Sequence, residues 1–169
     1  MFHLVLAGVP LDYRVAGTEV WQFRVQSNGT VDGSLTYPAS SLYNTVTTSE
    51  RGFLTIELKD KYGRVVNKFQ QLQTGFVFAI TAYVYDELNR LRYVIPPEAY
   101  DRFGTGAGKI TSFTENDAIF KELIFGYRYD SRGKIIEKHI PGAGWRYSVF
   151  DKRDVEVLFA DDSDLSKCY

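Results

Sequence analysis

Apolar and polar residues alternate along several short stretches of this chain. The segment 21–25, of sequence WQFRV, has this two-residue period, and residues 54–58 repeat it. Successive side chains of a β-strand point to opposite faces of its sheet, so strict alternation is typical of a strand with one buried face. The pattern therefore predicts strands at both places.

The segments around the first strand carry turn and loop signals. Ser27-Asn28-Gly29 is typical of a tight turn. Residues 32–52 are rich in Ser, Thr and Gly, and Tyr37-Pro38 would interrupt a ladder of strand hydrogen bonds. We expect a loop or an irregular edge there, within an N-terminal β/irregular segment, residues 1–50, that packs on the rest of the chain.

One short pattern recurs four times after residue 50. Each copy is a strand, an aspartate, two variable residues, a turn residue and a second strand, over the windows Ile56–Lys68, Ala82–Pro97, Gly126–Gly142 and Tyr147–Phe159. The aspartates are Asp60, Asp86, Asp130 and Asp151, and the turn residues three positions later are Gly63, Asn89, Gly133 and Asp154.

Turn chemistry explains this spacing. Aspartate often begins a type I turn, because its carboxylate accepts the backbone N–H two residues later. The fourth position needs a positive φ, which glycine adopts at no steric cost and asparagine tolerates better than most residues. Arg64, Arg90 and Lys134 follow the turns and could pair with an aspartate of their own or the adjacent hairpin. We therefore expect residues 51–160 to form antiparallel β-hairpin repeats, in a mainly β fold with a twisted, partly open sheet.

A loop–helix insertion at about 98–124 separates the second and third repeats. Thr114-Glu115-Asn116-Asp117 resembles a capping box, and apolar residues follow at helical spacing, so we expect one short helix near 114–123. The preceding stretch 103–109 is rich in glycine, but it lacks the Ser or Thr and the strand–loop–helix order of a phosphate-binding loop. Residues 161–169 form an acidic C-terminal tail.

Composition narrows the possible functions. The formal net charge is −1 at pH 7, so no basic excess favours a nucleic-acid partner or a membrane surface. One cysteine, Cys168, and two histidines, His3 and His139, give no internal disulfide and no recognisable metal or cofactor motif. No apolar stretch reaches the roughly 18 residues of a membrane span. The N-terminal apolar run is too short, and lacks the basic flank, for an export signal. We expect neither cofactor nor metal.

The repeat resembles the YD repeat of the Rhs (rearrangement hotspot) family. Tyr85-Asp86 followed by Arg90-Leu91, and Tyr129-Asp130 followed by Gly133-Lys134-Ile135, match its Tyr-Asp-x-x-Gly/Asn-Arg/Lys-Leu/Ile pattern. Residues 20–160 are similar to the segment that opens the YD-repeat region of large bacterial surface proteins. Lys59 and Val155 depart from the pattern, since they stand where it has Tyr and Arg.

The resemblance implies a non-enzymatic scaffold. In that family, hairpins join edge to edge into a cell-surface scaffold or a shell that encloses a toxin. It further implies an extracellular or cell-surface location. The expected partners are the rest of a larger Rhs-type polypeptide, or other copies of the chain joined through β-edges. The few repeats suggest a fragment or a short member of the family.

Two other functions remain open on the residues alone. Tyr85, Tyr127, Tyr129 and Trp145 could form a face on which sugar rings stack, as in a carbohydrate-binding module. Pairs of the repeat aspartates could serve a glycoside hydrolase, whose chemistry needs two carboxylates at a set separation. Turn formation and cross-strand packing already account for both sets of residues.

Overall fold

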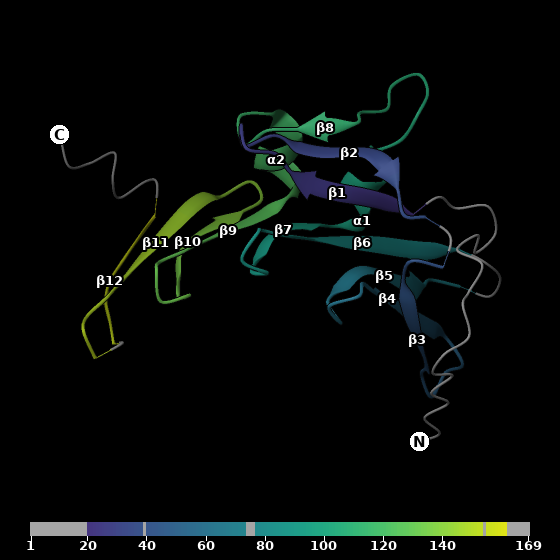
Figure 1. The fold of residues 1–169 in the computed structure, drawn as a ribbon, viewed down its shortest axis with the longest axis horizontal. Helices are drawn as coiled ribbons and strands as arrows, with labels where there is room; N and C mark the ends of the chain where they lie inside the picture. The colour runs from purple at the N-terminus through teal and green to yellow at the C-terminus, as the bar shows by residue number, and fades with distance from the viewer. Residues whose placement is uncertain (1–19, 39, 74–76, 154, 162–169) are drawn as a thin grey trace.

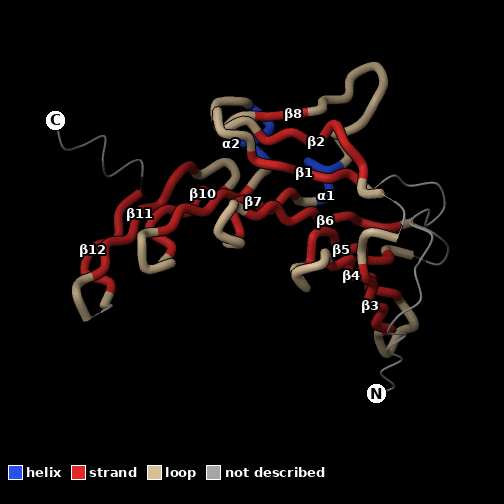
Figure 2. The backbone as a smooth tube through the Cα atoms, viewed as in Figure 1, coloured by secondary structure: helices blue, strands red, loops and turns tan. Residues whose placement is uncertain are grey.

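The computed structural model describes residues 20–38, 40–73, 77–153 and 155–161, and its fold is mainly β. Its strands form two antiparallel sheets, one of nine strands and one of three, accompanied by two short helices (Figures 1 and 2). The larger sheet is open at both ends. The expected mainly β fold with a partly open antiparallel sheet is confirmed.

The nine-stranded sheet is built almost entirely from hairpins between consecutive strands. Its spatial order is β12-β11-β10-β9-β7-β6-β5-β4-β3. The strands are β3 (Tyr43–Thr48), β4 (Leu54–Lys59), β5 (Val65–Gln71), β6 (Phe78–Tyr85), β7 (Leu91–Ile95), β9 (Phe125–Tyr129), β10 (Ile135–Ile140), β11 (Gly144–Phe150) and β12 (Glu156–Asp161).

The three-stranded sheet and the helices cover the middle of the large sheet (Figure 1). The small sheet has the order β1-β2-β8, with β1 (Trp21–Val25), β2 (Val31–Thr36) and β8 (Ser112–Phe113). The helices are α1 (Pro97–Tyr100) and α2 (Ala118–Leu123). The insertion between β7 and β9 supplies β8 and both helices, so it completes this second layer.

The core lies between the two layers and is rich in aromatic rings. Phe120 of α2 is fully buried, with its ring centroid 5.9 Å from that of Tyr93 on β7 and 4.2 Å from that of His139 on β10. Phe23 of β1 meets Phe103 edge to face at 4.8 Å. Burial of such large rings is the main force that holds the layers together.

One expectation about local structure was wrong. Residues 32–52 contain β2 and β3, because their Thr and Val residues suit a strand even where Ser and Gly are frequent. The short helix expected near 114–123 is present as α2, and the described residues contain a second short helix, α1, that was not expected. Pro97 begins α1, as its fixed φ and missing N–H suit a first helical turn. The N-cap residue of α2 is Asp117, the last residue of the expected capping box. The Thr114 N–H and hydroxyl both donate to the Asp117 carboxylate.

Some expectations fall on residues outside the described ranges. They are Asp154, residues 1–19 of the N-terminal segment and residues 162–169 of the acidic tail. Among the described residues, no helix has the length and apolar character needed to cross a membrane.

Candidate functional site

The four repeat aspartates lie at the turns of four successive hairpins. These turns, Asp60–Arg64, Asp86–Arg90, Asp130–Lys134 and Asp151–Val155, project from the same side of the large sheet (Figure 2). In the second, the Asp86 N–H donates to the Arg90 carbonyl at 2.9 Å and the Asn89 N–H donates to the Asp86 carbonyl at 3.0 Å. The register shifts beside each turn, as expected for a type I turn with a β-bulge.

Each carboxylate is used within its own turn. Oδ1 of Asp86 accepts the backbone N–H groups of Leu88 at 2.9 Å and Arg90 at 2.8 Å, and Oδ2 accepts the Arg90 Nε–H at 2.8 Å. Asp60 makes the same set with Tyr62 and Arg64. Asp130 and Asp151 each accept two backbone N–H groups in the same way. These bonds organise the turn and leave little carboxylate capacity for a ligand.

The fourth turn position has the positive φ that the sequence pattern requires. φ is +78° at Gly63, +61° at Asn89 and +81° at Gly133. Asn89 is one of only two non-glycine residues with positive φ in the described part of the chain, the other being Ser40.

The tyrosine before the aspartate joins one hairpin to the preceding one. The Tyr85 hydroxyl donates to the Val65 carbonyl at 2.9 Å, and the Tyr129 hydroxyl donates to the Leu91 carbonyl at 2.7 Å. A cation from the preceding turn lies over the ring of each tyrosine, Arg64 over Tyr85 and Arg90 over Tyr129. In the fourth repeat Phe150 precedes the aspartate, and Lys134 of the preceding turn lies over its ring. The aspartate of each Tyr–Asp pair therefore makes contacts within its own hairpin, and the tyrosine makes contacts with the preceding hairpin.

The hydrogen bonds lower the pKa of three turn aspartates. For Asp86, partial burial acts to raise the pKa, but hydrogen bonds from the Arg90 backbone and guanidinium outweigh it, and the pKa lies below its usual value. For Asp130 and Asp151 the main cause of the lowered pKa is the backbone N–H of Lys134 and of Val155, respectively. These carboxylates are therefore ionised near neutral pH, which suits turn formation.

The four proposed ring-stacking residues do not share one surface. Tyr127 pairs with Lys138 and Trp145 pairs with His139. Because Lys138 and His139 are consecutive on β10, their partners lie on opposite faces of the sheet. Trp145 packs against Phe120 and His139, with the Arg128 guanidinium 4.4 Å from its ring centroid. The guanidinium groups of Arg64 and Arg90 lie over the Tyr85 and Tyr129 rings, respectively.

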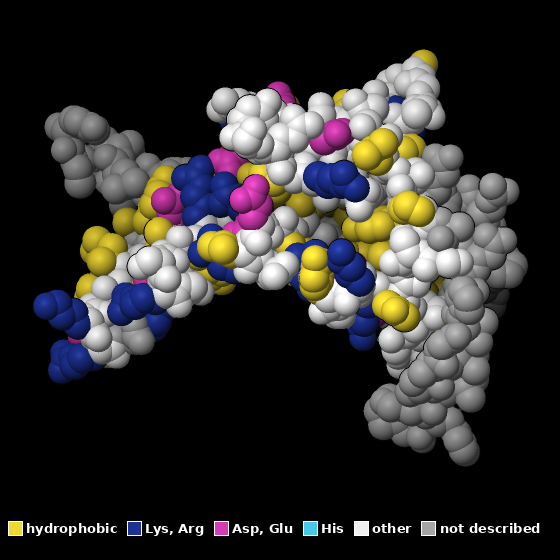
Figure 3. Space-filling model, in the orientation of Figure 1, with side chains coloured by type: hydrophobic (Ala, Val, Ile, Leu, Met, Phe, Trp, Pro, Cys, Tyr) yellow, Lys and Arg dark blue, Asp and Glu magenta, His cyan; other side chains and the backbone are white. Residues whose placement is uncertain are grey.

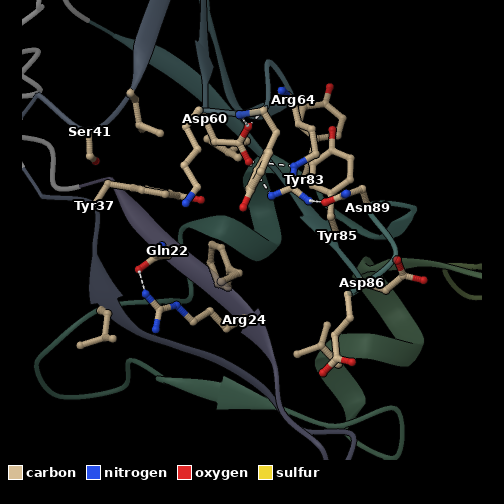
Figure 4. Close-up of a pocket in the computed structure, with 18 of the residues that line it drawn as sticks. Gln22, Arg24, Tyr37, Ser41, Asp60, Arg64, Tyr83, Tyr85, Asp86 and Asn89 are labelled. Atoms are coloured by element: carbon tan, nitrogen blue, oxygen red, sulfur yellow. Dashed lines mark hydrogen bonds and ion pairs between the residues drawn. The ribbon is translucent and has the colours of Figure 1, made fainter.

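A cleft lies between the small sheet and the first two repeat turns. Its volume is about 1110 Å³, and Gln22 and Arg24 of β1 face Tyr83, Tyr85 and the turn residues across it (Figure 4). Arg64 bridges two turns at this place, since it binds Asp60 and also donates to the Asn89 Oδ1 at 2.6 Å. No pattern in the sequence indicated this cleft, because it forms between elements that are distant along the chain.

The last strand of the large sheet, β12, exposes apolar side chains on both of its faces. Val157, Leu158 and Phe159 are consecutive, and each keeps 57–60% of its surface exposed. Figure 3 shows apolar side chains gathered over this end of the molecule. β12 pairs with β11 alone, so its outer edge has no partner strand within the described chain. An open edge flanked by apolar side chains is a site where another strand can add.

Residues 20–38, 40–73, 77–153 and 155–161 contain no group of three or more His, Cys, Asp or Glu placed to hold a metal ion. Comparison of the chain with protein-family models and with curated proteins finds no match in either set. The resemblance to the Rhs family therefore stays a prediction from the residues quoted for it.

Proposed function

We propose that this chain is a non-enzymatic structural module that supplies β-hairpins to a larger sheet, such as a cell-surface scaffold or a toxin-enclosing shell of the Rhs type. The observation that carries the proposal is β12, an open edge strand with exposed apolar side chains on both faces. Such a strand is the structure expected where a sheet continues.

The occupant of this edge is a further hairpin of the same kind. Hairpins in the sheet already join in this way at three places, where β5 pairs with β6, β7 with β9 and β10 with β11. Arg132 of the third turn reaches forward to the Asp151 carbonyl of the fourth. Arg153 occupies the same position of the fourth turn and is 85% exposed, so it can make the equivalent contact with a following hairpin.

The turn chemistry also supports a structural function. The aspartates that a hydrolase would use are bonded to their own turns, and the rings of Tyr85 and Tyr129 are covered by arginines. No observation favours the carbohydrate-binding or the hydrolase alternative over the scaffold.

Self-association tests the proposal, because without a further hairpin the β12 edges of two copies can pair with each other. We expect sedimentation velocity to show a reversible dimer at micromolar to millimolar protein concentrations, with the equilibrium shifted toward monomer by about tenfold or more in Leu158→Lys. A lysine there places a charge on the open strand. Leu72→Lys is the matched control, since Leu72 is 62% exposed but lies outside β12.

A chain that stays monomeric throughout this range, or a dimer equally sensitive to Leu72→Lys, would contradict the proposal. Circular dichroism of each variant should match the unsubstituted chain, which separates loss of association from loss of the fold.

A further inference from the structure

The junction between β7 and β9 is the shortest strand pairing in the large sheet. Its paired positions are Tyr93 with Gly126 and Val94 with Phe125. Every other pair of neighbouring strands in this sheet has at least four paired positions. β7 and β9 are joined through the long insertion of residues 96–124 and not by a short turn. The ladder therefore holds the half β3–β7 to the half β9–β12 more weakly than it holds the strands within each half.

An ion cluster built on Glu115 crosses this junction. Glu115 belongs to the insertion, and its Oε1 accepts from the Arg92 guanidinium at 2.8 Å and from the Tyr93 hydroxyl at 2.7 Å, both on β7. Its Oε2 accepts from the Arg128 guanidinium of β9. Arg128 also donates to the Glu137 carboxylate of β10 at 2.6 Å. One carboxylate of the insertion therefore binds a strand on each side of the junction.

Arg92 closes the same junction through the backbone. Its Nη1–H donates to the Tyr127 carbonyl of β9 at 2.7 Å, while its Nη2–H donates to Glu115. Because a guanidinium is planar, the directions of these two bonds are fixed relative to each other. The Arg92 and Glu115 side chains keep 21% and 22% of their surface exposed, so salt screens this pair less than an ion pair on the open surface.

An apolar contact also crosses the junction. The Phe120 ring of α2 packs on Tyr93 of β7 and on His139 of β10. Hydrophobic burial is not directional, so these rings favour contact between the layers but no single angle between the strands. Hydrogen bonds weaken steeply as they bend. The bonds of Glu115 and Arg92 are therefore the contacts that can fix this angle.

We propose that Glu115 clamps a hinge at the β7–β9 junction and so fixes the angle between the two halves of the large sheet. In Figure 1 the two halves extend in different directions from this junction. When the clamp is released, the halves rotate about the two backbone pairs that remain. This rotation changes the curvature of the sheet and the direction of its β12 end. The inference concerns the fold of a single chain and does not depend on the scaffold proposal.

Double electron–electron resonance between two spin labels measures this angle as a distance. The labels are attached at Lys61→Cys and Ser131→Cys, exposed turn positions on either side of the junction, in a chain that carries Cys168→Ser and is diluted with unlabelled chain. We expect a narrow distance distribution that broadens at least about twofold in Glu115→Gln, because the neutral amide no longer attracts both arginines. Glu122→Gln is the matched control on α2. Glu122 is exposed and makes no ion pair with a described residue, so the distribution should stay unchanged.

Hydrogen exchange separates opening of the hinge from general loss of stability. In Glu115→Gln the amides of residues 93–94 and 125–126 should exchange at least about tenfold faster, while those of β4, β5, β10 and β11 keep their rates. Arg92→Lys keeps the charge but cannot form both bonds as a planar fork, so it should give a smaller change of the same kind. Raising NaCl to about 1 M should speed exchange at these amides in the unsubstituted chain but not in Glu115→Gln.

The proposal is overturned if Glu115→Gln gives the same distance distribution as Glu122→Gln, or if its exchange rates rise equally in all strands of the large sheet. Should Glu115→Gln fail to fold, Arg92→Lys takes its place in both measurements. An unchanged distance distribution in Arg92→Lys would then overturn the proposal.

Discussion

Each of the first three repeat turns contains one residue whose backbone conformation most side chains resist. At Gly133 φ is +81°, and a Cβ built there meets no other atom within 4 Å. Any penalty for substitution there must therefore come from the backbone and not from a clash. Asn89 shows that a side chain is tolerated at the equivalent position when it is short and polar, since its φ is +61°.

Gly133→Val should lower the free energy of unfolding by about 1–3 kcal/mol, because a β-branched residue is strained at positive φ. Gly133→Asn should cost clearly less, because the native turn at Asn89 already uses that residue. Chemical denaturation of both variants measures the difference. Equal stability of the valine and asparagine variants would show that the turn does not hold this conformation in solution.

The hairpin is the repeated element, and the tyrosine hydroxyl is the bond that joins it to its neighbour. Tyr129 of β9 donates to Leu91 at the start of β7, and Tyr85 of β6 makes the same contact with Val65 of β5. In the second and third repeats the tyrosine stands directly before the turn aspartate. The side chain of this residue reaches back across the pair of strands that joins two hairpins, so its position in the repeat is explained by packing.

Tyr129→Phe should lower the free energy of unfolding by about 0.5–1.5 kcal/mol, the usual contribution of one hydrogen bond. Tyr127→Phe is the matched control on the same strand and the same face, and its loss should be near zero because no described group bonds its hydroxyl. Urea denaturation followed by tyrosine fluorescence or circular dichroism gives both values. If the two variants lose the same free energy of unfolding, the Tyr129 hydroxyl does not link the two hairpins.

At the scale of the whole molecule, stability depends on several ionised turn aspartates together. The pKa values of Asp86, Asp130 and Asp151 are lowered in the folded state. A group whose folded pKa is lower than its unfolded pKa stabilises the fold above the unfolded value, and this contribution is lost as the pH falls through the folded pKa. The second layer, with its aromatic core, has no such dependence on these three carboxylates.

The free energy of unfolding should therefore be constant near neutral pH and decrease as the pH is lowered from about 5 toward 2. Asp86→Asn should flatten part of this decrease, since the amide cannot ionise, while lowering stability at neutral pH. Thermal melting across this pH range tests the prediction. Identical pH profiles for Asp86→Asn and the unsubstituted chain would show that Asp86 does not contribute through its charge.

The amino-acid sequence by itself determined the hairpins. Their strands follow from alternation, and their turns follow from Asp at the first position and Gly or Asn at the fourth, because these are local requirements of the backbone. Bonds within four residues of one another, such as those of Asp60 to Arg64, are predictable for the same reason.

Tertiary structure decided the second layer, the cleft and the faces on which side chains lie. β2 and β3 form in a segment of weak strand character because partner strands satisfy their backbone groups. Trp145 and Tyr127 separate onto opposite faces because the register between β10 and its two neighbours sets their orientation. Strand register and layer packing bring together residues that are far apart in the chain. The stabilising free energy of these contacts comes from burial, which no short sequence pattern encodes.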